Sequence, residues 1–415
     1  MRCIKGMIVA GLWLLASHVS AFGSTPAAHP LPKVVVVRDD RPPPYHATPA
    51  QVTLLRTMAS KDGEKNALLR CIDYPDPPGT HWNHGTVVAM CSYMHSYPTT
   101  LDQLDSMFKT GGPALLTKYF DILKHEQSIG MSSWNLDKAF EDTFGCACKA
   151  SRDLADAWKA RAPDSSWAYV ASGVAYSAAA VATRGTDTFQ KTPAANIARM
   201  EELDARAAVD LGRALELDPD ATPAMISMIS VDRREGRSQE ARNRLADALR
   251  KHPDNLMLHE SAALVAMPNW GGSDSELQHE RERALAASTT NPLLVLVVSE
   301  IDWNQRQCGC EWSMDDYKAM NQIGPSLAVL RAAAGKANQT GDYAGAAIYA
   351  TELFRFSSTH EIWAHVQRGL ARKDMGDLDG AQEDVETALA EQPDYAPALG
   401  LARMLTYMRP GAVRH

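Results

Sequence analysis

Residues 362–395 read IWAHVQRGLARKDMGDLDGAQEDVETALAEQPDY, and this stretch decides the fold. Apolar residues recur three and four positions apart on both sides of Gly376-Asp377, which is the pattern of two amphipathic helices. Gly376 suits a tight reversal between them, because glycine adopts backbone conformations that other residues avoid. Ala381 is small enough to let the helices cross closely, and Pro393 ends the second helix. The stretch therefore predicts a helix–turn–helix unit.

The same pattern recurs with a period close to 34 residues. Residues 222–255, TPAMISMISVDRREGRSQEARNRLADALRKHPDN, carry Gly236, Ala241 and Pro253 at the matching positions, and Gly341 with Ala346 stands 35 residues before Gly376 with Ala381. A period of 34 with this arrangement resembles the tetratricopeptide repeat. The resemblance covers about half of the chain and implies an α-solenoid of antiparallel helix pairs. The matching positions are packing positions, so the resemblance implies a fold rather than an activity.

The rest of the chain also reads as helical. Caps such as Thr48-Pro49, apolar residues at helical spacing and proline or glycine breaks recur, whereas alternating strand patterns of useful length do not, apart from a short run at Val34–Val37. The predicted class is all-α, with a helical head followed by the solenoid. The expected domains are a Pro-rich extended arm at 22–48, a Cys-containing helical domain at 49–150, a helical domain at 151–221, and repeats at 222–409 with an insertion at 302–326. Residues 150–220 resemble an uncharacterised domain of bacterial envelope proteins that precedes such repeats, and this resemblance implies no activity.

The first 21 residues have the layout of a secretory signal peptide. Arg2 and Lys5 are followed by the apolar run Ile8–Ala16 and by the small residues of Val19-Ser20-Ala21. The run is too short to span a bilayer, and Cys3 precedes it, so we expect neither a membrane segment in the mature chain nor a lipid anchor. The chain is predicted to be exported, with the periplasm as the first expectation and secretion as the alternative.

Composition limits the classes of function. The chain has 415 residues, of which 45% are hydrophobic and 22% charged, with a formal net charge of -8. Its length suits two to three domains or one repeat array. An acidic balance of this size argues against a nucleic-acid partner.

Six cysteines remain after removal of the signal peptide. An even number in an exported chain predicts disulfides, and the spacing alone leaves fifteen pairings open. The candidates are Cys71, Cys91, Cys146, Cys148, Cys308 and Cys310. A redox role for the Cys308-Gly309-Cys310 turn is an alternative to structural bridging, which we favour.

Metal-binding and catalytic patterns give little support to an enzyme. His84, Cys91 and His95 share one helical face, but residues seven apart on a helix lie about 10 Å from each other, which is too far for one ion. The sequence has no G-x-S-x-G, no H-E-x-x-H and no P-loop. We predict no catalytic residue, no metal and no other cofactor.

The resemblance also implies which residues line the concave groove of the repeats. They are Ile226, Ser230, Arg233, Arg234, Arg331, Asn338, Trp363, Leu370 and Lys373. A partly basic groove on an acidic protein suits an acidic peptide or a C-terminal carboxylate. The predicted function is therefore an exported scaffold that binds a protein or peptide partner. Two alternatives stay open: an inhibitor or immunity-type protein of a secreted or periplasmic enzyme, and a thiol-redox or metal-binding envelope protein.

Overall fold

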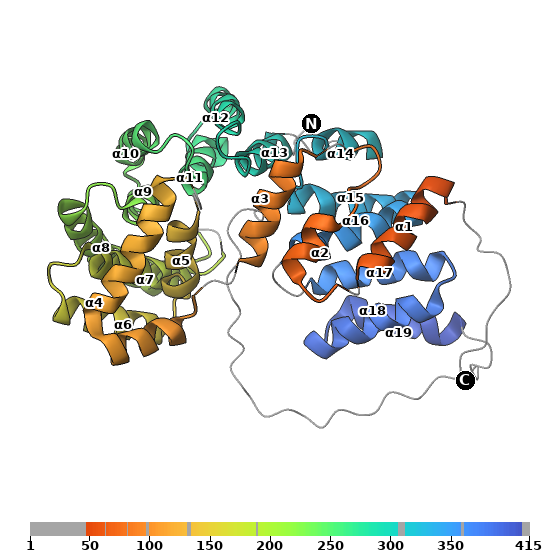
Figure 1. The fold of residues 1–415 in the computed structure, drawn as a ribbon, viewed down its shortest axis with the longest axis horizontal. Helices are drawn as coiled ribbons and strands as arrows, with labels where there is room; N and C mark the ends of the chain where they lie inside the picture. The colour runs from red at the N-terminus through yellow and green to blue at the C-terminus, as the bar shows by residue number, and fades with distance from the viewer. Residues whose placement is uncertain are drawn as a thin grey trace. The chain divides into compact units, whose positions relative to one another are not determined.

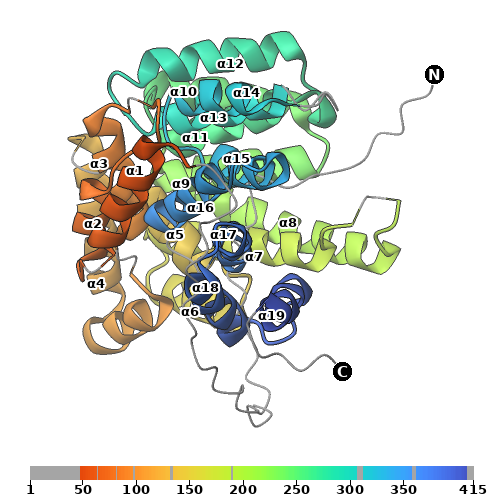
Figure 2. The same ribbon diagram turned by 90° about the vertical axis from the view of Figure 1, so that its right-hand side faces the viewer.

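The computed structural model describes residues 47–62, 64–80, 82–96, 99–130, 134–187, 190–305, 312–357 and 361–408. Every regular element in these ranges is a helix: nineteen α-helices and one 3-10 helix, with no strand (Figure 1, Figure 2). The prediction of an all-α protein is confirmed for this part of the chain. The predicted signal peptide, the arm up to residue 46 and the Cys308-Cys310 turn lie outside the described residues.

The chain forms two compact units. Among the described residues, unit 1 comprises residues 99–301, and unit 2 comprises residues 47–96 together with 302–408. The range 49–150, expected as one helical domain, is therefore divided between the units. The physical reason lies in the short helices before residue 96, which cannot bury an apolar face among themselves and which pack on a repeat helix instead.

Unit 1 begins with a kinked helix and continues as antiparallel helix pairs. Its elements are α4 (Leu101–Ser128), α5 (Asn135–Phe144), α6 (Lys149–Arg161), α7 (Ser166–Arg184), α8 (Ala194–Leu217), α9 (Thr222–Arg234), α10 (Ser238–Lys251), α11 (Leu256–Ala266), η1 (Pro268–Trp270), α12 (Asp274–Ala287) and most of α13 (Leu294–Gln305).

Aromatic side chains fill the first part of the unit 1 core. The ring of Phe120 stacks on those of Phe140 and Trp158, with centroids 4.3 Å and 5.7 Å apart. The long helices α7 and α8 cross at Gly173, where an added Cβ would lie 2.4 Å from Leu211 Cγ. A larger residue at Gly173 would force the two helices apart.

A buried carboxylate ties this core to the first repeats. Asp137 on α5 accepts hydrogen bonds from the hydroxyl of Thr222 (2.5 Å), the amide of Asn255 (2.6 Å) and the amide of Gln127 (3.0 Å). Thr222 and Asn255 stand at the starts of α9 and α11. Burial raises the pKa of Asp137 to about 6, although the three donors oppose the rise. One side chain thus fixes the starts of two first helices of the repeats.

Unit 2 combines three N-terminal helices with the C-terminal repeats. Its elements are α1 (Pro49–Lys61), α2 (Ala67–Asp73), α3 (His84–His95), α14 (Met314–Asn321), α15 (Leu327–Thr340), α16 (Tyr343–Phe356), α17 (Ile362–Asp374), α18 (Leu378–Glu391) and α19 (Ala396–Met408). Helices α1, α2 and α3 each contact α16. The segment 302–326, expected as an insertion, holds the short helix α14.

The repeats have the helix–turn–helix form that the sequence predicts. Helices α9 and α11 begin one 34-residue period apart, at Thr222 and Leu256, and α17 and α19 do the same, at Ile362 and Ala396. The turn glycine Gly376 has φ 86°, in the left-handed region that other residues rarely adopt. Ala381 is fully buried where α18 crosses α17. The chain is a TPR-like helical solenoid in these segments.

The buried position of Ala381 predicts the effect of a larger residue. Ala381→Phe should lower the free energy of unfolding by about 1–3 kcal/mol, because the aromatic ring overpacks the cluster of Ala381, Val385 and Leu401. Glu383→Phe, at an exposed site two residues away, should change it by less than about 0.5 kcal/mol. Urea unfolding of both variants measures the difference, and equal stabilities would contradict the assignment of this repeat.

Candidate functional site

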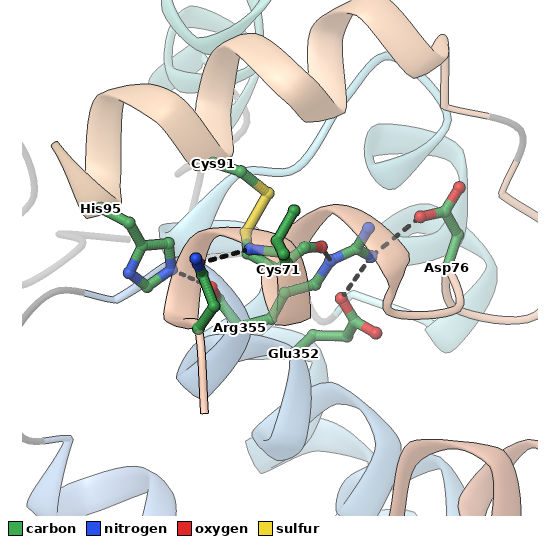
Figure 3. The surroundings of a disulfide bond; sticks show 8 residues. Cys71, Asp76, Cys91, His95, Glu352 and Arg355 are labelled. Carbon is green, nitrogen blue, oxygen red and sulfur yellow. Dashed lines mark hydrogen bonds and ion pairs between the residues drawn. A yellow bond between two sulfur atoms is a disulfide. The ribbon is translucent and has the colours of Figure 1, made fainter. Parts of the chain in front are cut away.

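A fully buried arginine on α16 holds the N-terminal helices of unit 2. Arg355 is 4% exposed and donates hydrogen bonds to the carbonyl oxygen of Cys71 (2.8 Å), to Asp76 (2.8 Å) and to Glu352 (3.2 Å). Figure 3 shows these groups converging beside the Cys71–Cys91 pair. The ring N–H of His95 Nε2 donates to the carbonyl oxygen of Arg355 at 2.8 Å. Both the main chain and the side chain of Arg355 therefore bind the segment 67–96.

Aromatic rings close the space around this guanidinium. The rings of Phe356, Trp82 and Tyr74 lie 4.7, 5.7 and 6.0 Å from it. The Trp82 indole N–H donates to the carbonyl oxygen of Asn321 at 2.5 Å. Through Cys71 and His95 this centre joins α2 and α3 to the repeat helix α16.

One arginine faces two carboxylates in this centre, and their exposure differs. Asp76 retains 28% of its side-chain exposure, whereas Glu352 is fully buried and its Oε1 has no hydrogen-bond partner. Burial, assisted by the charge of Asp76, raises the pKa of Glu352 to about 8, with Arg355 opposing the rise. Glu352 is therefore the carboxylate that holds a proton at neutral pH.

The cysteines fall into three cases. The sulfur atoms of Cys71 and Cys91 are 2.03 Å apart, and those of Cys146 and Cys148 are 2.30 Å apart. Cys308 and Cys310 lie outside the described residues. Because the sulfur of Cys91 lies at disulfide distance from that of Cys71, it is not placed to share a metal ion with His95 or with the exposed His84. The described part of the chain has no group of three His, Cys, Asp or Glu side chains placed to hold a metal ion.

Four of the nine predicted groove residues lie on α9 in unit 1. Ile226 is buried in the repeat core, and Ser230 is half-exposed. Arg234 is committed to structure, since it forms an ion pair with the fully buried Asp204 and donates to Ser177. Only Ser230 and Arg233 combine exposure with freedom from the core.

Arg233 has no carboxylate partner among the described residues. Its guanidinium lies 5.0 Å from the ring of Trp270, which is 44% exposed, and it makes no hydrogen bond or ion pair with another described residue. Burial, together with the positive charges of Arg234 and Arg184, lowers the pKa of Arg233 to about 10. An arginine in such surroundings favours an anion supplied from elsewhere.

Carboxylates occupy the neighbouring first helices. Glu260 on α11 and Glu300 on α13 are half-exposed on helices that are otherwise mostly buried. Burial, followed by the charges of Glu141 and Glu300, raises the pKa of Glu260 to about 8, and burial raises that of Glu141 to about 7. We call five half-exposed residues of α9, α11 and α13 the first-helix face of unit 1; they are Ser230, Arg233, Glu260, Leu264 and Glu300.

Sequence reasoning missed three residues: Trp270, which lies beside Arg233, and Glu260 and Glu300 on the neighbouring first helices. The lengthened turn at 268–272 interrupts the repeat pattern, so the pattern did not assign these three residues. A signal for Glu260 exists, because Leu256 begins a repeat as Thr222 does, which gives Glu260 the position of Ile226.

The other five predicted groove residues lie in unit 2, on α15 and α17. Arg331 forms an ion pair with Glu361 (2.7 Å) and lies 5.9 Å from the ring of Trp363. Asn338 donates to Gln367, and Leu370 packs against the repeat core. Lys373 forms an ion pair with Asp374. Arg331 and Lys373, the two cations predicted for this part of the groove, therefore already have acidic partners.

Unit 1 also contains a cavity of about 540 Å³ between α6, α7 and α8. Four cations line it: Lys149, Arg152, Arg199 and Arg206. Lys149, Arg199 and Arg206 form ion pairs with Asp153, Glu202 and Asp156, and Arg152 donates to the carbonyl oxygen of Ala147. These cations are largely neutralised, in contrast to Arg233.

Comparison with known proteins assigns no family to this chain. No known protein family matches the chain, and no curated protein matches it in sequence. Among solved structures, the chain is similar to one in the crystal structure of the APC/C hetero-tetramer Cut9–Hcn1, with 13% identity and a TM-score of 0.35. The similarity covers 85% of this chain and 65% of that one. No helix among the described residues is long and apolar enough to cross a bilayer.

The raised pKa of Glu352 gives the stability of the protein a defined pH dependence. The folded state binds the proton more tightly than the unfolded chain, so the contribution of Glu352 is present below about pH 4.5 and is lost as the pH rises through about 8. Glu352→Gln keeps the side chain neutral and should make the variant relatively more stable than the parent above pH 8. Urea unfolding at pH 6 and pH 9 measures this, with Glu383→Gln as the exposed control. An equal loss between the two pH values in parent and Glu352→Gln would contradict the protonated state.

Proposed function

We propose that this chain is a protein-binding scaffold and that the first-helix face of unit 1 holds the partner. The single observation that carries the proposal is Arg233, a half-exposed cation on a repeat helix with an exposed tryptophan beside it and no acidic partner among the described residues. Arginine and tryptophan are the residue types that most often dominate interface energies. Extended faces of helical repeats suit macromolecular partners better than small substrates.

The charges of the face define what the partner presents. Arg233 favours a carboxylate, from an acidic side chain or a free C-terminus, and its planar guanidinium binds such a group through two hydrogen bonds. Trp270 offers an apolar surface next to that contact. Glu260 and Glu300 supply no positive charge for a second anion, so the partner is acidic at one end only.

Export is part of the same proposal. It is supported by the signal-peptide layout of residues 1–21 and by the disulfide distance between Cys71 and Cys91. An exported scaffold would act on partners in the periplasm or outside the cell.

Export predicts the oxidation state of the six cysteines of the mature chain. Protein isolated from its native compartment, denatured without reductant, should show fewer than four free thiols, because an oxidising compartment preserves disulfides. Titration with a thiol reagent gives the number. Four or more free thiols would contradict an oxidising location.

A peptide selection tests the binding face. The full chain, immobilised, is offered a synthetic library of random decapeptides with free C-terminal carboxylates and the same library with amidated ends. We expect it to retain peptides with a carboxylate at one end. Arg233→Ala should reduce their retention about tenfold or more, because their carboxylate then lacks its guanidinium.

The matched control is Arg213→Ala, which removes an exposed arginine paired with Glu216 on α8. This variant should retain the same peptides as the parent. A folded Arg233→Ala variant with unchanged retention would refute the proposed face.

A further inference from the structure

The helix α4 bends at one glycine and presents its second half along the surface of unit 1. Gly112 has φ 69° and ψ -170°, and the next residue is Pro113, so the helix changes direction there (Figure 1). The segment from Pro113 to Ser128 then runs on as a regular helix. Its inner side is buried, with Leu116, Phe120 and Leu123 in the core of the unit.

The outer side of this segment carries a second apolar row. Leu115, Ile122 and Ile129 are 38%, 48% and 54% exposed. They stand seven residues apart: Leu115 and Ile122 lie on one line along the helix about 10 Å apart, and Ile129 is the C-cap residue directly after its last turn. Single exposed apolar residues are common on protein surfaces, but three at heptad spacing form the seam by which one helix docks on another.

Two charged residues flank the middle of this row. Lys118 precedes Ile122 by four residues and Glu126 follows it by four. Neither side chain makes a hydrogen bond or ion pair with another described residue, although the neighbouring Lys124 pairs with Asp218. The apolar residues and the two charged residues are therefore placed symmetrically about Ile122, and the two charges have opposite signs.

This arrangement complements itself when a second helix runs antiparallel. With a two-fold axis at Ile122, that side chain meets its own copy once, whereas the Leu115–Ile129 and Lys118–Glu126 pairings each occur twice. We propose that the outer face of α4, defined by Leu115, Lys118, Ile122, Glu126 and Ile129, is the interface of a symmetric homodimer.

The charges favour a second copy of this chain over an unrelated partner helix. An unrelated antiparallel helix would need a basic residue, an acidic residue eight positions after it, and an apolar residue midway between them. A second copy supplies that pattern without further requirement. The inference is independent of the proposed function, because α4 carries none of the first-helix face.

Sedimentation equilibrium of the full mature chain over a range of concentrations tests the proposal. We expect a species of twice the chain mass. Ile122→Asp should raise the dissociation constant at least tenfold, since two carboxylates then meet at the axis. The matched control is Val209→Asp, an equally polar change at a residue on α8 that is 73% exposed, and it should leave the association unchanged.

Charge reversal tests the register. Lys118→Glu and Glu126→Lys should each weaken the dimer, because each places like charges opposite one another. The double variant exchanges the two charges and should restore association to near the parent value. Circular dichroism of each variant verifies that it is folded, which keeps the result interpretable.

Two outcomes would overturn the proposal. A chain that is monomeric at every concentration would show that the face has another occupant, such as another segment of the chain or a different protein. A dimer that survives Ile122→Asp, or whose double charge variant is no stronger than the single ones, would place the interface or its register elsewhere.

Discussion

Close crossing of paired helices is the constraint on which this structure depends. The repeat helices are short, so each buries its apolar face only against neighbours, and neighbours approach only where one side chain is small. Gly173 lies against Leu211, an added Cβ at Gly369 would lie 2.8 Å from Leu401, and Ala381 is fully buried at its crossing. This requirement fixes the residues at the packing positions and leaves the half-exposed positions of the first helices less constrained.

Buried charge is handled by specific pairing almost throughout the described chain. Arg355 is matched by Asp76 and by the carbonyl oxygen of Cys71, Arg234 by Asp204, and Asp137 by three hydrogen-bond donors. Removing a charged group from water is costly, and these partners offset the cost. The half-exposed Arg233 differs from these groups, because its acidic partner is not among the described residues.

Local patterns predicted much of this architecture, and long-range pairings could not be predicted. The spacing of Gly376, Ala381 and Pro393 alone predicts a helix pair, and the position of Arg233 in its repeat predicts that it lines the groove. The binding of Cys71 and Asp76 by Arg355 joins residues about 280 positions apart and has no signature in either segment. For the same reason the sequence alone does not separate Arg234 from its neighbour Arg233, because the ion pair between Arg234 and Asp204 is a long-range contact.

The central claim is that Arg233 binds a partner, whereas Arg234 stabilises the fold. The free energy of unfolding of Arg233→Met and Arg234→Met in urea tests it most directly, since methionine preserves the apolar length of both side chains. The account predicts that Arg234→Met loses about 3–5 kcal/mol because Asp204 is left buried and unpaired, whereas Arg233→Met is as stable as the parent or more stable. A comparable loss in both variants would contradict the account, because Arg233 would then also be a structural residue.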